Sequence, residues 1–245
     1  MKLKTNSTKE IRTLINLASL ITDEVTFQFD EEGMKFKGMD PSHVCLIDAK
    51  MTKDMFEEYD LKGSFTLATQ NLMNVFKRAE GGDRVKIELA GTEEVIIHFE
   101  NTYDKLYRLH TLGGTVGETP LPKLSPNTKI ELTSKGWKKI LEDLRILSSH
   151  INIKANQDQV EFLGKGDVGE GKATLVKGYA DLLGLEVKEE SEGKYALEYL
   201  INLSKYIQDE KITLEYSSKM PIKIHFKLSE LGGSVDYYLA PRIES

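Results

Sequence analysis

The strongest constraint in this sequence is an internal repeat, which appears when the chain is compared with itself at an offset of 126 positions. Apolar residues of segment 8–40 then fall on apolar residues of segment 134–166. The offset holds first through helical spacing and then through strand-like alternation. The matched pairs include Ile11 with Trp137, Leu14 with Ile140, Ile15 with Leu141, Ala18 with Leu144, Val25 with Ile151, Phe27 with Ile153 and Phe36 with Phe162. A repeat of this length indicates two copies of one α+β domain rather than a solenoid of short repeats.

The division into domains follows from a change in composition near the middle of the 245 residues. A stretch there holds three of the six prolines together with three glycines, which is typical of an extended connector. We predict an N-terminal domain over residues 1–113, a connector over 114–128 and a C-terminal domain over 129–245. Each half is long enough to bury its own core. Leu121 and Leu124 either fasten the connector to the domains or form part of a docking site, and the residues alone leave both interpretations open.

Hydrophobic spacing predicts four helices and two sets of antiparallel strands. Ser7 or Thr8 can cap the first helix by accepting a backbone N–H. The predicted helices are Thr8–Leu20, Asn71–Ala79, Ser134–Leu147 and Tyr195–Ile207. The predicted strands are a hairpin over 24–37, then 43–48, 63–67, 85–89, 95–99, 105–112, 151–155, 160–163, 173–179, 212–216, 222–226 and 235–239. The fold class is therefore α+β, with two similar domains that each carry two helices on antiparallel sheets.

Charge is distributed unevenly between the predicted helices and the rest of the chain. The formal net charge is −6, yet the predicted helices together are net positive because acidic clusters occur in turns and loops. One interpretation is that Lys and Arg are good helix formers and simply face solvent. The other is that one helical surface faces a polyanion, which would be attracted only there.

Composition argues against several other classes of protein. The sequence has no run of about 18 apolar residues, so we expect no membrane span. The N-terminus has no apolar segment followed by a cleavage site, so we expect no secretory signal. The single cysteine, Cys45, cannot form an internal disulfide and fits a reducing compartment. Its mid-strand position indicates a small buried residue rather than a nucleophile.

One motif matches a nucleotide site by its letters alone. Gly164–Gly169 reads G-x-G-x-x-G after a predicted strand, but a dinucleotide site requires a helix next. Segment 172–179 is instead β-branched and extended, so we predict a flexible turn. The five histidines show no metal-ligand spacing, and we find no paired carboxylates, nucleophile elbow or P-loop. We therefore predict no catalytic residue, no metal site and no cofactor.

Two segments carry a close resemblance to a known family. They are Gly38–Ile47, which reads GMDPSHVCLI, and Tyr237–Glu244, which reads YYLAPRIE. Together with the duplication and the Pro-Leu-Pro connector, they resemble the sliding clamps of the proliferating cell nuclear antigen type, particularly archaeal ones. The resemblance covers essentially the whole chain. It implies a closed trimeric ring of six similar domains, with helices lining the hole and sheets forming the outer shell.

The resemblance also gives the charged helices a role as the surface that faces duplex DNA. Contacts to phosphates carry no sequence information, so such a ring can slide. The cations implied to contact phosphates are Lys9, Arg12, Lys77, Arg78, Lys135, Lys138, Lys139, Arg145 and Lys205. The fourth helix is weaker in this respect, because Glu198 offsets Lys205.

Two further sites follow from the resemblance. Strand 107–112 of one subunit is implied to pair with strand 173–179 of the next, with Tyr107, Leu109, Thr111, Thr174, Val176 and Gly178 at the interface. Family partners, namely DNA polymerase, flap endonuclease, DNA ligase and the clamp loader, are implied to dock a short peptide under the connector. The implied docking residues are Met39, His43, Val44, Leu121, Pro221, Tyr238, Ala240, Pro241, Arg242 and Ile243.

The leading hypothesis is a DNA polymerase processivity factor that encircles duplex DNA without catalysis of its own. A second hypothesis is one subunit of a heterotrimeric clamp, or of a checkpoint-type ring that acts as a scaffold. A third is an enzyme that binds a nucleotide at the Gly164 loop. The first predicts a nucleoid-associated cytoplasmic protein if the source is archaeal and a nuclear protein if it is eukaryotic.

Overall fold

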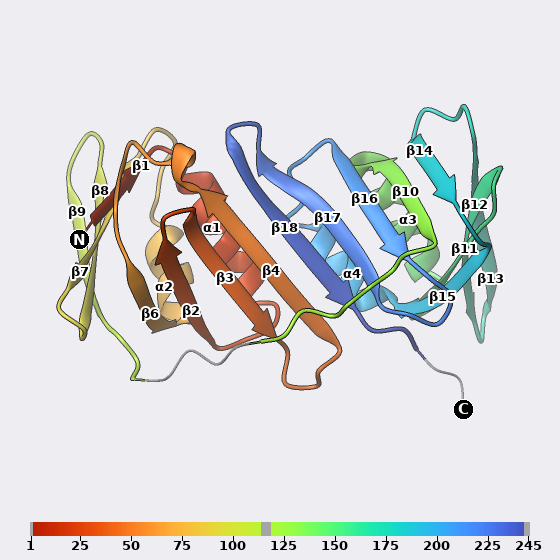
Figure 1. Ribbon diagram of the computed structural model, residues 1–245, viewed down its shortest axis with the longest axis horizontal. Coiled ribbons are helices and arrows are strands. Elements are labelled where there is room, and N and C mark those ends of the chain that lie inside the picture. The colour runs from red at the N-terminus through yellow and green to blue at the C-terminus, as the bar shows by residue number, and fades with distance from the viewer. Residues whose placement is uncertain (1, 114–118, 243–245) are drawn as a thin grey trace. The chain divides into compact units, whose positions relative to one another are not determined.

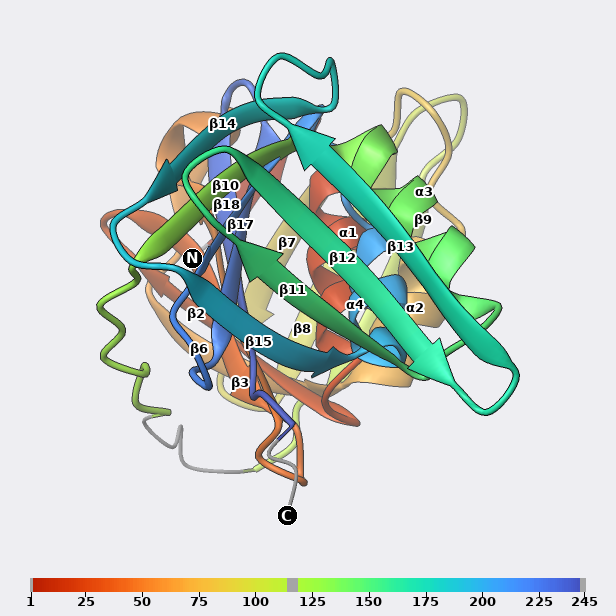
Figure 2. The same cartoon turned by 90° about the vertical axis from the view of Figure 1, so that its right-hand side faces the viewer.

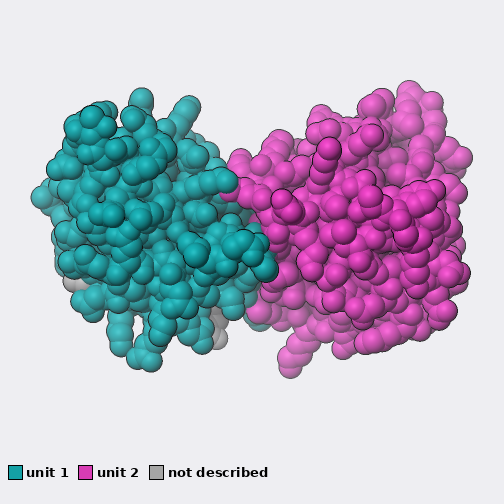
Figure 3. Space-filling model, turned by 90° about the horizontal axis from the view of Figure 1, so that it is seen from above, with its two compact units in different colours: residues 1–120, 227–235 teal, residues 121–226, 236–245 magenta. Residues whose placement is uncertain are grey.

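The computed structural model describes residues 2–113 and 119–242, which form two compact units (Figure 3). The first unit comprises residues 1–120 together with 227–235, and the second comprises 121–226 together with 236–245. The hairpin end at 227–235 thus groups with the first unit although it follows most of the second in sequence. The boundaries predicted from composition stay a prediction.

The first unit holds two helices among its described residues, α1 (Thr8–Ala18) and α2 (Thr69–Phe76), and a short 3-10 helix η1 (Lys53–Met55). One sheet has the strand order β5-β1-β7-β8-β9, and a second group has the order β6-β2-β3-β4. The strands are β1 (Lys2–Thr5), β2 (Glu24–Asp30), β3 (Gly33–Met39), β4 (Cys45–Thr52), β5 (Glu58–Asp60), β6 (Gly63–Ala68), β7 (Arg84–Ala90), β8 (Glu94–Glu100) and β9 (Lys105–His110).

The second unit holds α3 (Ser134–Arg145) and α4 (Leu197–Ser204). Its strands follow the orders β14-β10-β16-β17-β18 and β15-β11-β12-β13. They are β10 (Thr128–Thr133), β11 (His150–Ala155), β12 (Gln159–Gly166), β13 (Gly169–Val176), β14 (Leu182–Val187), β15 (Ser191–Ala196), β16 (Lys211–Tyr216), β17 (Ile222–Ser229) and β18 (Gly232–Leu239).

The two strand orders match element by element, which confirms the duplicated α+β fold. β5-β1-β7-β8-β9 corresponds to β14-β10-β16-β17-β18, and β6-β2-β3-β4 corresponds to β15-β11-β12-β13. The paired strands in both units are antiparallel. In each unit the two helices pack against one another and lie on one face of the strands (Figure 1).

The repeated apolar residues form the cores. Ile11 and Leu14 on α1 are buried, as are their counterparts Trp137 and Ile140 on α3. Burying a side chain of this size stabilises a fold by about 1.5–3 kcal/mol. The ring of Trp137 meets Phe162 of β12 edge-on at 6.0 Å between centroids, a favoured aromatic geometry. Helical spacing in the sequence thus identified the faces that bury against the sheets.

The glycines of the G-x-G-x-x-G motif serve packing. Gly164 and Gly166 end β12, Gly169 begins β13, and these antiparallel strands pair without a helix after the motif. A Cβ at Gly166 would collide with the carbonyl oxygen of Leu147, just after α3, and one at Gly164 would sit 3.3 Å from Leu144 Cβ. The flexible turn predicted from the sequence is a regular hairpin that passes close to the end of α3.

Several predicted element boundaries were wrong. α2 begins at Thr69 and ends at Phe76, so Lys77 is its C-cap and Arg78 lies in the following turn. α4 begins only at Leu197, because Tyr195 belongs to β15, where its ring is buried and its hydroxyl donates to the Met220 carbonyl oxygen at 2.9 Å. Five further strands were not predicted from the sequence, namely β1, β5, β10, β14 and β15.

Helix capping differs between the two copies. Ser7 occupies the N-cap position of α1 without a side-chain capping bond, and the Thr8 hydroxyl donates instead to the Asp83 carbonyl oxygen at 2.8 Å. At α3 the cap is Thr133, whose hydroxyl oxygen accepts from Gly136 N at 3.0 Å. The predicted side-chain cap of the first helix was therefore wrong.

The described part of the connector, residues 119–127, has neither helix nor strand. Its end is held by Asn127 N, which donates to the Ser217 hydroxyl at 2.9 Å. Leu121 is 39% exposed and Leu124 is half-buried. Within residues 2–113 and 119–242, no helix is long and apolar enough to cross a membrane.

Candidate nucleic-acid interface

The first unit presents cations from both of its helices. Lys9 and Arg12 are exposed on α1 and lie three residues apart, so their side chains share one side of the helix. That side is opposite the buried stripe. Lys77 and Arg78 are exposed at the end of α2. All four predicted cations of this unit therefore reach solvent.

The second unit presents a matching set on α3 and α4. Lys135, Lys139 and Arg145 are exposed on α3, and Lys205 is exposed at the C-cap of α4. Lys205 Nζ donates to Asn202 Oδ1 at 2.8 Å. Lys138 differs, because it is half-buried and its ammonium donates to the Ile207 carbonyl oxygen beyond α4 at 2.9 Å. This lysine fastens the two helices together and is the least available of the predicted cations.

Equivalent positions in the two copies carry the same charge. Lys9 and Lys135 are each the second residue of a helix, since α1 begins at Thr8 and α3 at Ser134. Lys77 and Lys205 are the C-caps of α2 and α4. The C-cap lysines complement the helix dipole, which favours cations at C-termini by about 0.3–1 kcal/mol. Lys9 and Lys135 lie at the opposite, unfavourable end, so helix stability does not account for them.

These helix cations also differ from many cations of the strands in their partners. Within the described residues, none of Lys9, Arg12, Lys135, Lys139 and Arg145 forms an ion pair with a carboxylate. The ion pairs instead belong mainly to strands. Examples are Lys4 of β1 with Glu100 at 2.6 Å, Lys105 of β9 with Asp83 at 2.9 Å and Lys223 of β17 with Asp236 at 3.4 Å.

The predicted subunit-interface residues lie on or beside strands at sheet edges. β9 ends the order β5-β1-β7-β8-β9, and β13 ends the order β15-β11-β12-β13. Tyr107 and Leu109 are half-buried on β9, with Thr111 just after it. Thr174 and Val176 are half-buried on β13, with Gly178 exposed beyond it. Each strand therefore has one side without a partner strand among the described residues.

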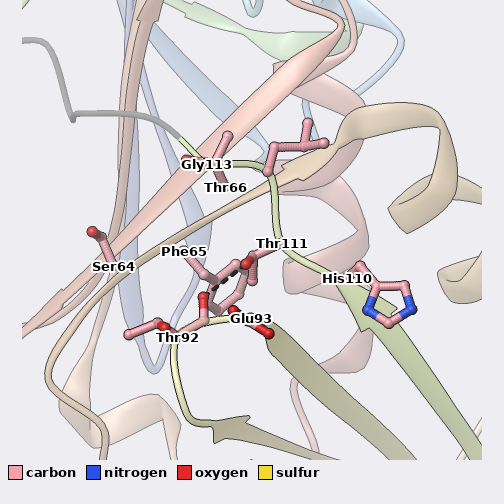
Figure 4. A pocket seen from close by; sticks show the side chains of 9 residues that line it. Ser64, Phe65, Thr66, Thr92, Glu93, His110, Thr111 and Gly113 are labelled. Atoms are coloured by element: carbon pink, nitrogen blue, oxygen red, sulfur yellow. Dashed lines mark hydrogen bonds between the residues drawn. The ribbon is translucent and has the colours of Figure 1, made fainter.

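A polar pocket of about 640 Å³ opens beside the end of β9 (Figure 4). Thr111 forms one wall: its hydroxyl donates to the Thr92 carbonyl oxygen at 2.8 Å, and its N–H donates to the Glu93 carbonyl oxygen at 2.9 Å. The N–H of the next residue, Leu112, donates to the Thr66 carbonyl oxygen of β6 at 2.8 Å. The chain leaving β9 is thus fixed to β6 and to the turn before β8.

The predicted peptide-docking residues fall in both units. In the first, the buried carboxylate of Asp40 accepts from Val44 N at 2.8 Å and shapes the loop in which His43 has a φ of 57°. Six further docking residues belong to the second unit: Leu121 and Arg242 are exposed, Pro221, Ala240 and Pro241 are half-buried and Tyr238 is buried. Met39 and Val44 are half-buried, and Ile243 lies outside the described residues. Their common site stays a prediction.

Two family models match this chain. "Proliferating cell nuclear antigen, N-terminal domain" matches residues 2–112, and "Proliferating cell nuclear antigen, C-terminal domain" matches residues 121–242. The chain belongs to the proliferating cell nuclear antigen family. The family resemblance read from the sequence is thereby confirmed, and the chain is a clamp-type protein.

Relatives and solved structures agree with membership of the proliferating cell nuclear antigen family. The chain is similar to the DNA polymerase sliding clamps of Cenarchaeum symbiosum, at 35% identity, and Nitrosopumilus maritimus, at 33%. Each match covers 99% of this chain and 98% of the relative. Its fold is similar to that of PCNA from Thermococcus kodakaraensis, with a TM-score of 0.92 and 21% identity over 98% of this chain and 99% of the other. It is also similar to the PCNA2–PCNA3 complex from Sulfolobus tokodaii, with a TM-score of 0.90 and 24% identity over the whole of both chains.

Proposed function

We propose that this protein is a DNA polymerase processivity factor, a ring that encircles duplex DNA and has no catalytic activity of its own. The observation that carries the proposal is the pair Lys9 and Lys135. Both are exposed, both lack a carboxylate partner among the described residues, and both lie at the helix end where a cation is unfavourable. A polyanion bound at these lysines would offset the unfavourable interaction of their charges with the helix dipoles. Duplex DNA is a suitable polyanion because its phosphates are contacted regardless of base sequence.

The edge strands support ring formation by three copies of the chain. β18 is the repeat equivalent of β9, and β4 is the equivalent of β13. Within the first unit, the start of β18 lies against β4, so that a Cβ at Gly233 would sit 2.9 Å from the Lys50 carbonyl oxygen. We propose that β9 of one subunit meets β13 of the next in the same manner, which removes both open edges. The number of three rests on the family resemblance.

We further propose that the docking residues from Met39 to Ile243 receive a short peptide of DNA polymerase, flap endonuclease, DNA ligase or the clamp loader. The support is chemical: apolar side chains suit aromatic anchors, and the C-terminal tail offers main-chain hydrogen-bonding groups. Because the similar relatives are archaeal, we place the protein at the nucleoid in the cytoplasm.

Retention on DNA tests the proposal. A protein loaded on nicked circular DNA should stay bound, and linearising that DNA should release it from the free ends. Equal retention on circular and linear DNA would contradict encirclement. Light scattering of the purified chain tests the assembly separately: a trimer mass supports the homomeric ring, whereas a chain that stays monomeric would support one subunit of a heterotrimer.

A further inference from the structure

The second unit contains a cavity of about 680 Å³ beside the edge strand β15, which we call the β15 pocket. Within the described part of the chain, its charged lining consists of Lys165, Lys194, Lys219, Arg242 and the acid Glu192, with His150 beside them. Of the described residues predicted from the sequence to bind partners, Pro241 and Arg242 line it. The pocket therefore combines four cations that are distant in sequence.

The β15 pocket lies on the face of its sheet opposite the helices. Successive side chains of a strand alternate between faces. On β11, Ile151 and Ile153 are buried toward the helices, so Asn152 points to the other face. On β12, Phe162 faces the helices and Lys165 lies on the same face as Asn152. Figure 2 shows α3 and α4 behind this sheet. A duplex that contacts the helices cannot reach the pocket of the same unit.

Among the described residues, the cations that line the β15 pocket outnumber the acids that line it. Glu192 accepts from Asn152 Nδ2 at 2.6 Å. Within the described residues, Lys165, Lys219 and Arg242 form no ion pair with a carboxylate. Lys219 moreover has a φ of 58°, a left-handed conformation that costs a residue with a side chain about 1–3 kcal/mol.

Main-chain hydrogen bonds hold the walls of the β15 pocket in place. Arg242 N donates to the Lys194 carbonyl oxygen at 2.7 Å, which joins the C-terminal tail to the outer edge of β15. Lys219 N donates to the Glu192 carbonyl oxygen at 3.2 Å. Burial lowers the pKa of His150, and the charges of Arg242 and Lys194 lower it further, so these cations act on the pocket interior. The site is thus a formed, positively charged hollow at the tail.

We propose that the β15 pocket binds an acidic peptide segment, a run of Asp or Glu that flanks the docking peptide of a partner protein. This proposal rests on the proposed function, because Pro241 and Arg242 of the C-terminal tail belong both to the pocket and to the predicted docking site. A protein segment fits better than nucleic acid because the pocket and the helix cations occupy opposite faces of one sheet. Screening limits charge effects to about 8–10 Å, so the local cations prevail over the net charge of −6.

Fluorescence anisotropy with labelled hexaglutamate tests this directly, using hexaglutamine and a short oligothymidylate as companion probes. The variant Lys165→Gln/Lys219→Gln removes two exposed cations of the pocket. Lys177→Gln/Lys188→Gln is the matched control, since it removes two exposed cations of the same unit that do not line the pocket. We expect the pocket variant to bind hexaglutamate about tenfold more weakly, equivalent to about 1.4 kcal/mol, and the control to be nearly unchanged.

Three results would overturn the proposal: hexaglutamate binding no tighter than hexaglutamine, an equal loss in both variants, or a loss of oligothymidylate rather than hexaglutamate binding in the pocket variant. The last would make the pocket a nucleic-acid site. The assay needs neither ring closure nor DNA. If the protein is not retained on circular DNA but binds hexaglutamate through Lys165 and Lys219, only the clamp proposal is contradicted. If it is retained on circular DNA but does not bind hexaglutamate through these lysines, only the pocket proposal is contradicted.

Discussion

Gly166 decides how closely β12 can pass beneath the end of α3. The extended segment predicted to follow the G-x-G-x-x-G pattern is confirmed, because β13 pairs with β12 there. The packing role of Gly166 could not be predicted, since the colliding group is the main-chain oxygen of Leu147 in another element. Local sequence reveals which conformation a glycine allows, but not what approaches it in the folded chain.

Gly166→Ala should lower the free energy of unfolding by about 1–3 kcal/mol, because the new methyl group forces β12 away from α3. Thermal unfolding followed by circular dichroism measures this. Gly81→Ala is the control, because a Cβ there meets nothing within 4 Å. Equal midpoints for the two variants would argue against the close packing.

Asp83 is a buried carboxylate that accepts from Glu80 N at 2.9 Å, Asn101 Nδ2 at 2.8 Å and Lys105 Nζ at 2.9 Å. Burial acts to raise the pKa of Asp83, but these hydrogen bonds and the charge of Lys105 outweigh it and lower the pKa. A lowered pKa in the folded state stabilises the fold above the unfolded value, about 3.9, and this stabilisation is lost as the pH falls through the folded value.

Asp83→Asn should therefore lower the unfolding midpoint by several degrees at neutral pH, and the difference from the unmodified protein should shrink below about pH 4. Unfolding curves recorded from neutral to acid pH check the trend. Asp167→Asn, in the exposed turn between β12 and β13, is the control, and its unfolding midpoint should not show this dependence on pH. A difference for Asp83→Asn that stays constant with pH would contradict the assigned role.

Among the elements, long amphipathic segments were predicted well and short strands poorly. α1 and α3 were identified because several turns of helical spacing specify one buried face. β1 and β5 have four and three residues, too few to show a period, and form through pairing with distant strands. Tyr195 was predicted to belong to α4 because it fits the helical spacing, but it is a residue of β15 with a buried ring. The helix cations could be found from charge alone, whereas the β15 pocket could not, because its cations come from β12, β15, a turn and the tail.

The edge strand β13 gives an element-scale prediction. Val176→Asp places a charge on the half-buried end of β13, where the proposed interface would have to bury it. We expect light scattering to show mostly monomer at concentrations where the unmodified chain is trimeric. Leu231→Asp, at an exposed turn 71% accessible, should leave the mass unchanged. A Val176→Asp chain that stays trimeric would remove β13 from the interface.

For the molecule as a whole, the arrangement of charge matters more than its sum. The chain is acidic, but exposed cations occur on the helices and in the β15 pocket, on opposite faces of a sheet in the second unit. Strand cations are largely neutralised by pairs such as Lys105 with Asp83. If both proposals hold, phosphate and carboxylate ligands would be bound at once without competing for the same residues.

Lys9→Gln/Lys135→Gln should weaken binding to duplex DNA without weakening the fold, because both lysines lie at helix N-termini where a cation is unfavourable. The slope of log affinity against log salt should fall in magnitude by about 0.9 for each phosphate that the variant no longer neutralises. Anisotropy of a labelled duplex over a salt series measures it. The Lys177→Gln/Lys188→Gln control should keep the original slope, and an equal change in the control would point to net charge instead.

Residues 227–235, contributed by the last hairpin, group with the first unit and lie against β4. A chain cut after residue 120 would leave that flank of β4 bare, and a bare strand flank invites aggregation. Producing the first half by itself therefore calls for grafting this late segment behind residue 120 through a short linker. The segment that can fold independently in this protein is therefore defined by which residues are neighbours in space, and not by their order in the sequence.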